Sequence, residues 1–343
     1  MTRTSWALLC AVALAAGCTD GTESEDDATD TTTTGITSDL TLPPGTTSPT
    51  PASGIYRTEP TDGNVGDGYA ENFRYDSATD TFYVEGLGFD GDQEEGLPFQ
   101  RSTPGTLNGF ALYEAPATHP DSLTGAPITQ MEHRALYGIS TSGSGDVEFA
   151  IVRTGSYTGY GFGGFAYQRN GSVVLPTGGQ ALYTGQYAAL RDFNGAGGIE
   201  YASGDMEVAI DFNGFSSQCS GGCASAVRGF VTNRLYFDSD GNDITAAYLT
   251  ALGTENSTTY TELPTLVFTV GPGVMDDNGE VTGAVTSRIT TSSGVETHES
   301  GTYYAILSGD DAEELVGVLV VESDYPIDGN VTVRETGGFI LER

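Results

Sequence analysis

Residues 181–212 carry the pattern that most restricts the fold of this chain of 343 residues. Along the second half of this stretch apolar and polar side chains alternate, with Met206, Val208, Ile210 and Phe212 on one side and Asp205, Glu207 and Asp211 on the other. A period of two is typical of a β-strand with one buried and one wet face. Residues 194–198 read Asn-Gly-Ala-Gly-Gly, and glycine tolerates the positive φ of a tight turn. We therefore predict a β-hairpin formed by residues 181–193 and 199–212.

The same pattern recurs in the rest of the C-terminal half. It predicts further strands at residues 162–168, 226–237, 265–270, 281–289, 301–307, 315–322 and 333–342. Turn sequences rich in Asp, Asn and Gly separate these strands, and we expect no helix between them. Hairpin-linked strands favour an antiparallel barrel, whose closure removes exposed sheet edges. Residues 315–321 are apolar on both faces, so we expect them in the best-covered part of the barrel wall.

Residues 55–160 are less regular. Their pattern predicts a hairpin formed by residues 73–76 and 81–85. It also predicts three short strands, at residues 109–113, 134–139 and 147–153. A helical turn is expected near residues 128–135. Five prolines between positions 98 and 127 argue against a long element there, because proline donates no backbone hydrogen bond.

Residues 156–162, Ser-Tyr-Thr-Gly-Tyr-Gly-Phe, lie between these two parts. Exposed aromatic side chains often anchor partners, so the run fits a binding face. It also fits a strand that leads into the barrel, which is the interpretation we favour. No helix is expected after its glycines, so it does not resemble a phosphate-binding loop.

The first eighteen residues are a targeting segment. One arginine, Arg3, precedes an apolar run that ends in Leu-Ala-Ala-Gly-Cys at Cys18. This resembles the bacterial lipobox, in which the cysteine is diacylated and becomes the new N-terminus; simple secretion is the alternative. Residues 19–54 are rich in Thr, Ser, Asp and Pro and have too few apolar side chains to fold. We expect them to be a disordered tether between the anchor and the folded part.

The charge of the chain excludes several classes of partner. Its formal net charge is −34, and all thirteen basic residues are arginines. Such a surface repels nucleic acid and anionic lipid headgroups. We therefore expect no nucleic acid partner, and contact with a membrane only through the lipid anchor.

Two cysteines remain in the expected mature fold, Cys219 and Cys223. Three residues separate them, two of which are glycine, and this spacing lets the chain fold back into disulfide geometry. Outside the cytoplasm such a pair forms a disulfide. A redox-active pair is usually CxxC, and a zinc site needs further ligands nearby. We predict a structural disulfide that stiffens a loop.

Other polar residues carry weaker signals. Asp238, Asp240 and Asp243 resemble part of a calcium loop, but Leu249 stands where the closing glutamate of an EF-hand belongs. Asp and Gly are also common in hairpin turns, which is the interpretation we favour. The three histidines, His119, His133 and His298, form no metal or catalytic motif, and GxSxG is absent. We therefore expect no catalytic residue, metal or cofactor, although the abundant carboxylates leave a glycosidase pair open.

Four short segments resemble one protein family. They are residues 181–185 (Ala-Leu-Tyr-Thr-Gly), 301–304 (Gly-Thr-Tyr-Tyr), 311–317 (Asp-Ala-Glu-Glu-Leu-Val-Gly) and 337–343 (Gly-Gly-Phe-Ile-Leu-Glu-Arg). These segments are similar to the barrel domain of transferrin-binding-protein-B-like surface lipoproteins. The resemblance implies an all-β fold, with a handle-like antiparallel β domain at residues 55–160 followed by an eight-stranded antiparallel β-barrel at 161–343, filled by side chains. Full receptors have two such lobes, and this chain has the length of one.

The resemblance also implies a function. Family members sit on the outer membrane and capture an iron-carrying protein, or another ligand, for a partner transporter. No residue of 55–160 matches the host-protein contacts of the family. We therefore expect a monomeric, non-enzymatic, lipid-anchored envelope protein that binds a protein or metal-carrying ligand, with an outer-membrane transporter as a candidate partner. The alternatives are a structural or adhesive envelope lipoprotein, and a secreted hydrolase, which needs a pocket with converging polar groups.

Overall fold

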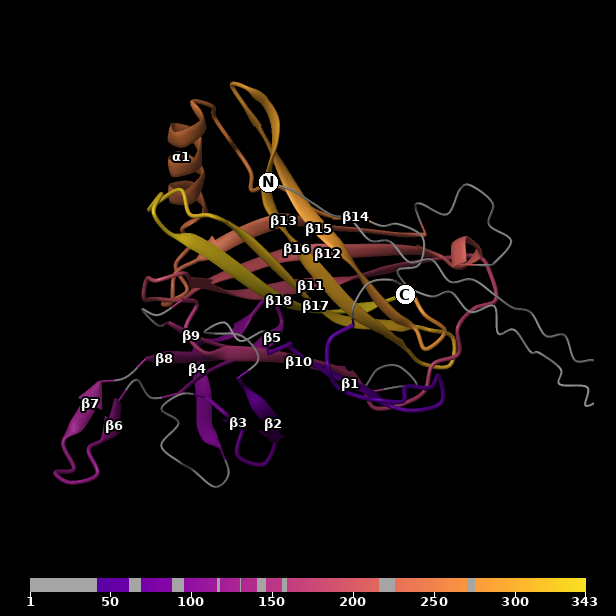
Figure 1. Cartoon of the computed structure of the whole chain (residues 1–343), viewed down its shortest axis with the longest axis horizontal. Coiled ribbons are helices and arrows are strands. Elements are labelled where there is room, and N and C mark those ends of the chain that lie inside the picture. The colour runs from indigo at the N-terminus through magenta and orange to yellow at the C-terminus, as the bar shows by residue number, and fades with distance from the viewer. Residues whose placement is uncertain are drawn as a thin grey trace, which may run out of the picture. The chain divides into compact units, whose positions relative to one another are not determined.

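The computed structural model describes residues 42–61, 69–87, 96–115, 118–129, 131–140, 146–155, 159–215, 226–269 and 275–343. Within them the chain forms an open eight-stranded sheet, a closed barrel and a separate two-stranded hairpin. Figure 1 shows the open sheet in indigo and magenta and the barrel in rose, orange and yellow. The all-β fold class predicted from the alternation is confirmed.

The barrel consists of eight strands, each antiparallel to the next. They are β11 (Gln180–Phe193), β12 (Glu200–Asp211), β13 (Val227–Phe237), β14 (Leu266–Thr269), β15 (Glu280–Thr291), β16 (Gly294–Ser308), β17 (Glu314–Asp324) and β18 (Thr332–Glu342). Pairing of β11 with β18 closes the ring. The predicted hairpin is present as β11 and β12, with Tyr183 opposite Val208. Met206 and Val208 are buried while Asp205 and Glu207 are exposed, as the period of two predicted.

Side chains fill the interior of the barrel. Phe268 and Tyr303 stack with ring centroids 4.0 Å apart, and both are buried. Gly337 leaves the space that the ring of Tyr187 occupies, because a Cβ at this glycine would lie 2.2 Å from that ring. Burying such apolar side chains contributes about 1.5–3 kcal/mol each, so this packing stabilises the closed wall.

The open sheet has the order β1-β10-β9-β8-β5-β4-β3-β2. Its strands are β1 (Ile55–Thr58), β2 (Glu71–Asp76), β3 (Thr81–Glu85), β4 (Leu97–Leu107), β5 (Phe110–Ala115), β8 (Glu132–Ser140), β9 (Val147–Gly155) and β10 (Gly163–Arg169). Strand β10 was expected to begin the barrel, but it pairs with β9 and β1. The sheets therefore change between Arg169 and Gln180, and not at Tyr160. Alternation identifies a strand but does not indicate which sheet it joins.

Two expectations for the N-terminal part were wrong. Strand β4 is long although it contains Pro98 and Pro104. Its pairing with β5 is interrupted between Arg101 and Thr106, and proline is tolerated at such an irregularity. The helical turn near residues 128–135 is absent: β7 (Pro127–Thr129) and β8 occupy this region, and β8 pairs with a neighbour on both edges.

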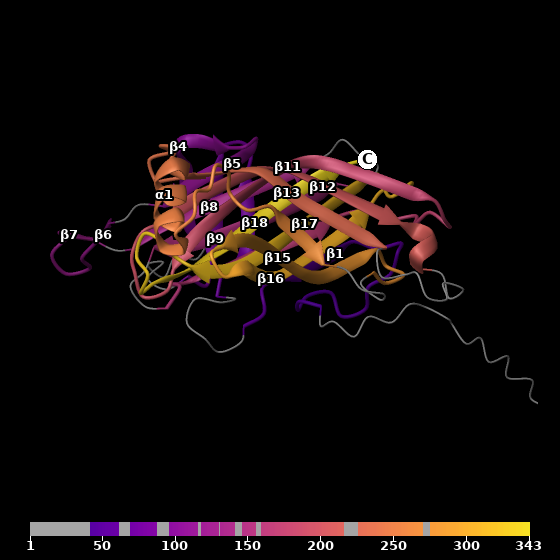
Figure 2. The same cartoon turned by 90° about the horizontal axis from the view of Figure 1, so that it is seen from above.

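Two helices of the described chain lie between barrel strands, where none was expected: a short 3-10 helix, η1 (Phe212–Phe215), and an α-helix. Helix α1 (Thr245–Asn256) has no side-chain cap at its N-terminus and buries Thr245, Tyr248 and Leu252. The buried residues follow helical spacing, but alanines at 246, 247 and 251 spread apolar character over the other faces, so the sequence shows little amphipathic contrast. Figures 1 and 2 both place α1 at the end of the barrel where β17 connects to β18. There Tyr248 contacts Tyr325, with ring centroids 6.3 Å apart.

The open sheet packs against the outside of the barrel. Val316 and Val318 of β17 are buried in a cluster with residues of β9 and β10, while Leu315 and Leu319 are buried in the barrel core. This confirms the prediction that residues 315–321 are covered on both faces. A second contact is made by Gly338, where a Cβ would lie 2.1 Å from the ring of Phe149.

One buried ion pair and one buried arginine–threonine contact also join the open sheet to the barrel. The guanidinium of Arg57 binds both carboxylate oxygens of Glu280, at 2.6 and 2.7 Å. Arg153, on β9, donates to Glu59 at 2.8 and 2.9 Å and to the hydroxyl of Thr336 on β18. Moving two ions this deep out of water costs free energy. Only a close, well-aligned pairing offsets that cost, and both of these pairs are bidentate.

Candidate binding groove beside strand β14

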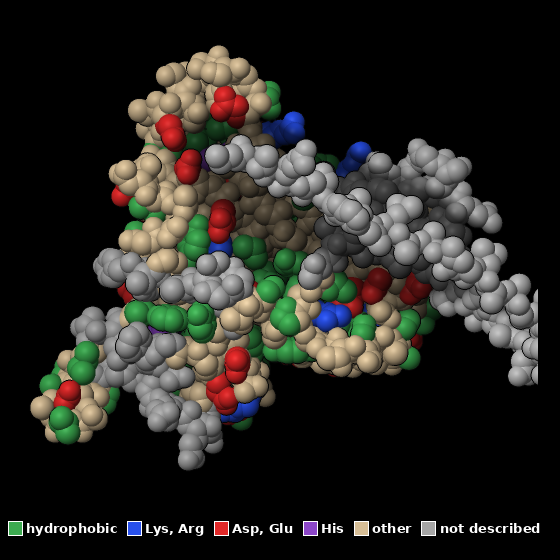
Figure 3. Space-filling model, in the orientation of Figure 1, with side chains coloured by type: hydrophobic (Ala, Val, Ile, Leu, Met, Phe, Trp, Pro, Cys, Tyr) green, Lys and Arg blue, Asp and Glu red, His purple; other side chains and the backbone are tan. Residues whose placement is uncertain are grey.

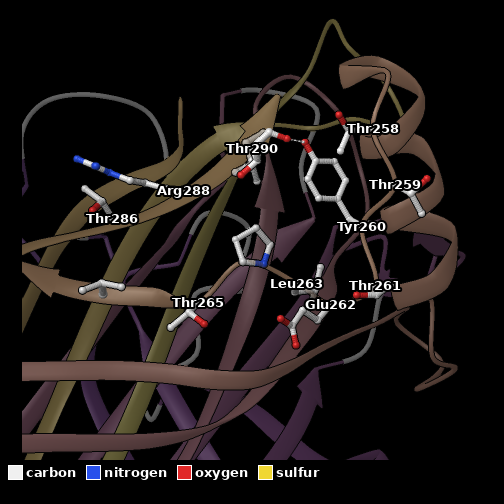
Figure 4. Close-up of a pocket in the computed structure, with 13 residues that line it drawn as sticks. Thr258, Thr259, Tyr260, Thr261, Glu262, Leu263, Thr265, Thr286, Arg288 and Thr290 are labelled. Atoms are coloured by element: carbon white, nitrogen blue, oxygen red, sulfur yellow. Dashed lines mark hydrogen bonds between the residues drawn. The ribbon is translucent and has the colours of Figure 1, made fainter. Parts of the chain in front are cut away.

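An open groove of about 750 Å³ lies on the barrel beside β14. One wall is the loop from α1 to β14 and the other is β15, as Figure 4 shows. The lining side chains are Thr258, Thr259, Tyr260, Thr261, Glu262, Leu263, Pro264, Thr265, Val267, Thr286, Arg288, Ile289 and Thr290. A second hollow, of about 770 Å³, lies between the same loop and α1.

The groove follows from where the pairing of β14 with β15 ends. Val267 of β14 faces Thr286 of β15. If the pairing continued in the same register, Thr265 would face Arg288. The ladder stops at Val267 instead, and the space beyond it forms the groove.

Two features turn the chain out of the sheet at this point. Pro264 has no N–H and cannot donate to a sheet ladder. Its carbonyl oxygen accepts a hydrogen bond of 2.9 Å from Nη1 of Arg234, whose side chain is buried inside the barrel. Leu263, which precedes it, is buried in the barrel core. The loop is therefore anchored inward where a strand would otherwise run beside β15.

The opposite wall is a hairpin that extends beyond its neighbours. Strands β15 and β16 pair as far as the turn between Thr291 and Gly294, whereas β16 pairs with β17 only from Ser300 onward. At the start of the extension the register shifts, because Ser287 faces Glu299 while Arg288 faces Thr297. In the described part of the chain, no strand pairs with the outer edges of this extension.

One hydrogen bond crosses the groove. The hydroxyl of Tyr260, in the loop, donates to the backbone carbonyl oxygen of Thr290 at 2.8 Å, as the dashed line in Figure 4 marks. Burial and the nearby carboxylate of Glu296 raise the pKa of Tyr260, so this hydroxyl keeps its proton at neutral pH. The bond occupies a backbone acceptor on the free edge of β15.

The groove is polar and has little positive charge. Its exposed side chains include the hydroxyls of Thr259 and Thr261 and the carboxylate of Glu262, and Arg288 is the one basic residue of the lining. On the face shown in Figure 3, acidic side chains gather at the end that carries α1 and basic ones are few. A partner with complementary charge at this end is therefore basic.

A buried charge network lies beneath the groove. Arg234 binds Glu299 at 2.7 and 2.8 Å and Glu335 at 3.0 Å, and the hydroxyl of Tyr187 donates to Glu335 at 2.8 Å. Burial opposes ionisation of Glu299, but the Arg234 guanidinium outweighs it and lowers the pKa of this carboxyl to about 2. The same guanidinium holds the carbonyl of Pro264, so the network fixes the loop that forms the groove wall.

Within the described residues, no cluster of three or more His, Cys, Asp or Glu side chains is placed to hold a metal ion. His298 lies near the network, where its Nε2 is 3.1 Å from the hydroxyl of Tyr248, and burial lowers its pKa.

Among the residues that the structure describes, no helix combines the length and apolar character needed to cross a membrane.

The cysteines predicted to carry lipid or to form a disulfide, Cys18, Cys219 and Cys223, lie outside the described residues. Their lipidation and pairing therefore remain predictions from the sequence.

The acidic residues considered for calcium lie in the connection from β13 to α1. Oδ1 of Asp238 accepts hydrogen bonds from the backbone N–H groups of Asp240 and Asn242, at 3.0 and 2.8 Å. Oδ1 of Asp243 accepts one from the N–H of Thr245 at 2.8 Å. The side-chain amide of Asn242, which donates to Oδ2 of Asp238 at 2.9 Å, and the backbone N–H groups of Asn242 and Asp240 lower the pKa of Asp238. The arrangement is that of a turn closed by its own aspartate.

The histidines and the aromatic junction do not converge on one site. His119, His133 and His298 lie on three different strands, β6 (Thr118–Pro120), β8 and β16. Tyr160 lies in the connection from β9 to β10, where its hydroxyl is 3.0 Å from that of Thr332 and Arg334 lies over its ring. The described part of the junction therefore packs onto the end of β18.

Sequence reasoning missed the residues that form the groove. Tyr260 and Arg288 occur in no motif. The buried network leaves a weak signal in the sequence. Arg234 stands two positions before the buried Tyr236, and Glu299 stands four positions before the buried Tyr303. Even spacing places each charged residue on the same, inward side of its strand as the tyrosine. A charged residue at a core position indicates a buried pair or a functional site.

Comparisons with known proteins yield similar structures but no family. No protein-family model and no curated protein matches the chain. Two solved structures are similar, a double mutant and a single mutant of the vaccine antigen transferrin binding protein B from Haemophilus parasuis Hp5. They share 13% and 12% identity and TM-scores of 0.35 and 0.34, over 85% of this chain. The matches cover 51% and 52% of those structures, so this chain spans about half their length.

Proposed function

We propose that this chain is a lipid-anchored binding protein of the outer membrane surface that captures a protein or metal-carrying ligand, and that it is not an enzyme. The lipobox at Cys18 and the polar segment at residues 19–54 support an anchor with a tether. The barrel motifs quoted from the sequence support capture on behalf of a partner transporter.

The observation that carries the proposal is the contrast between the inside and the outside of the barrel. Inside, the buried network of Arg234, Glu299 and Glu335 and closely packed aromatic rings fill the space. Outside, the groove beside β14 offers a polar hollow and an unpaired strand edge among the described residues. Small-molecule enzymes usually enclose their substrate in a concave pocket with converging polar groups, and an open groove is better suited to a large partner.

The anchor is tested by Cys18→Ala in the native cells, compared with the unaltered protein. Without acylation the targeting segment should stay uncleaved and the protein should not reach the outer-membrane fraction, and globomycin should have the same effect on the unaltered protein. A variant with unchanged size and membrane fractionation would contradict the anchor. Cleavage of the unaltered protein by protease added to intact cells would support exposure at the outer surface.

Capture is tested by pull-down from the native culture with the protein lacking residues 1–54, with and without iron limitation. A co-purifying protein or metal carrier is expected, with an outer-membrane transporter recovered alongside it. Recovery of neither would favour a structural or adhesive envelope lipoprotein.

A further inference from the structure

The extended hairpin directs backbone groups into the groove. The turn between Thr291 and Gly294 has two residues, and such turns are closed by a pair that exchanges backbone hydrogen bonds. In an antiparallel ladder hydrogen-bonded and non-hydrogen-bonded pairs alternate. Thr290, opposite Val295, therefore belongs to a non-hydrogen-bonded pair and points its N–H and C=O away from β16, as does Arg288, opposite Thr297. The bond from Tyr260 to the carbonyl of Thr290 agrees with this orientation.

These groups form a short open sheet edge. Among the described residues, β14 pairs with β15 no further than Thr286, and no other strand lies beside Arg288 and Thr290. The groove lies where the next strand would run. A strand needs about 4.8 Å from its neighbour, and the loop that forms the far wall leaves the sheet at Pro264.

We propose that an extended segment of a partner polypeptide adds to the barrel beside β15, antiparallel to it, and pairs with the backbone of Arg288 and Thr290. The inference rests on the proposed binding function and identifies the surface that performs it. The added strand takes the place that β14 vacates, and its N–H replaces the hydroxyl of Tyr260 on the carbonyl of Thr290. Tyr260 thus covers the edge while no partner is bound, which protects it from unspecific pairing.

Charge indicates the kind of segment. Besides burial, the negative charges of Glu296 and Glu255 both raise the pKa of the Tyr260 phenol, so both carboxylates lie near the groove. Glu262 adds a third carboxylate in the lining, whereas Arg288 is its one guanidinium. The chain as a whole carries −34 formal charges. A partner segment with lysine or arginine and β-branched residues fits this edge, because it complements the charge and favours the extended conformation.

The test uses a fluorescein-labelled synthetic peptide of alternating valine and threonine with lysines at both ends, and the full chain. Fluorescence anisotropy should show binding to the unaltered protein. Thr290→Pro removes a donor from the groove edge and should weaken binding about tenfold or more, the equivalent of about 1.4 kcal/mol. Thr297→Pro is the matched control, since it removes a donor from the opposite free edge of the same hairpin, and it should bind normally. Tyr260→Phe frees the carbonyl of Thr290 and should bind several-fold more tightly.

A second arm does not depend on the folding of any variant. The same peptide with N-methyl groups on alternate amides cannot pair as a strand and should not bind the unaltered protein. Equal binding of both peptides, equal binding to Thr290→Pro and Thr297→Pro, or no binding at all would overturn strand addition. Sedimentation would reveal a dimer that Thr290→Pro abolishes if a second copy of this chain occupies the edge, which would overturn the assignment to a partner. If the pull-down recovers the same partner with Thr290→Pro, capture stands and strand addition falls.

Discussion

The hydroxyl of Tyr260 lies 2.8 Å from the backbone carbonyl oxygen of Thr290, and this hydrogen bond links the two walls of the groove. It joins a loop to a strand edge that is otherwise open in the described part of the chain. The bond is exposed to solvent, so water competes for both partners.

Tyr260→Phe should loosen the loop with little loss of global stability. A typical net contribution of a hydrogen bond is about 0.5–1.5 kcal/mol, and exposure places this one near the lower end. Hydrogen exchange should become faster for the amides of residues 258–263 and stay unchanged in β11 and β12. Thr290→Val is the control, because it changes the side chain and leaves the carbonyl in place. Equal acceleration in both variants would show that the loop does not depend on this bond.

Arg234→Met should destabilise the barrel strongly. It removes the cation between Glu299 and Glu335, two carboxylates that are both buried. Loss of one partner of a buried pair costs about 3–5 kcal/mol. Arg288→Met, on the exposed face of the same barrel, should change the free energy of unfolding by less than about 0.5 kcal/mol. Urea denaturation measures both, and similar values for the two variants would contradict the role of the network.

Acid should unfold the protein partly through Glu299. Its pKa is lowered from 4.5 to about 2 in the folded state, so the unfolded state binds the proton more readily. The stability from this group is therefore present above pH 4.5 and is lost as the pH falls toward 2. Glu299→Gln should flatten the decline in unfolding free energy over this range. An equally steep decline in the variant would assign acid sensitivity to other carboxyl groups.

Gly338→Ala should weaken the packing of the open sheet on the barrel. The added Cβ would lie 2.1 Å from the ring of Phe149, whereas Gly329→Ala, in the connection from β17 to β18, meets nothing within 4 Å. Overpacking typically costs about 1–3 kcal/mol. Thermal unfolding should show a lower Tm for Gly338→Ala and an unchanged one for Gly329→Ala. An unaltered Tm in both would mean that Phe149 can move aside.

Much of the barrel could be predicted because most of its strands alternate between apolar and polar side chains and the middle of β17 is continuously apolar. The burial of Met206 and Val208 and the double coverage of residues 315–321 follow from side-chain pattern alone. The sheet that contains β10 could not be predicted, since pairing partners depend on the whole topology. Helix α1 gave little signal because Ala246, Ala247 and Ala251 spread apolar residues around it, and β4 was missed because Pro104 lies where its pairing is irregular and Pro98 lies next to its first residue.

The groove was beyond the reach of sequence patterns for a physical reason. It depends on where the pairing of β14 ends, which is determined by the bond from Arg234 to the carbonyl of Pro264 and by the burial of Leu263. These contacts join residues that are distant along the chain. The register of a hairpin can be predicted from its turn, but the sequence does not show where a strand such as β15, within the described residues, lacks a paired neighbour.

The predicted disulfide between Cys219 and Cys223 has its own test. Peptide mapping of the protein from native cells, without reduction, should yield one linked peptide. Cys219→Ser should change the free energy of unfolding only modestly, because a ring this small restricts the unfolded chain little. Two free thiols in the exported protein would contradict the prediction.

The central claim is that the groove beside β14 binds the partner of an anchored surface protein. It is tested most directly by placing a photoreactive benzoylphenylalanine at Thr259, an exposed residue of the groove, in the full chain on native cells. The same residue at Glu207, exposed on β12, is the control. The account predicts that ultraviolet light yields a crosslinked partner from position 259 and none from position 207. Crosslinking that is absent at 259, or equal at both positions, would contradict it.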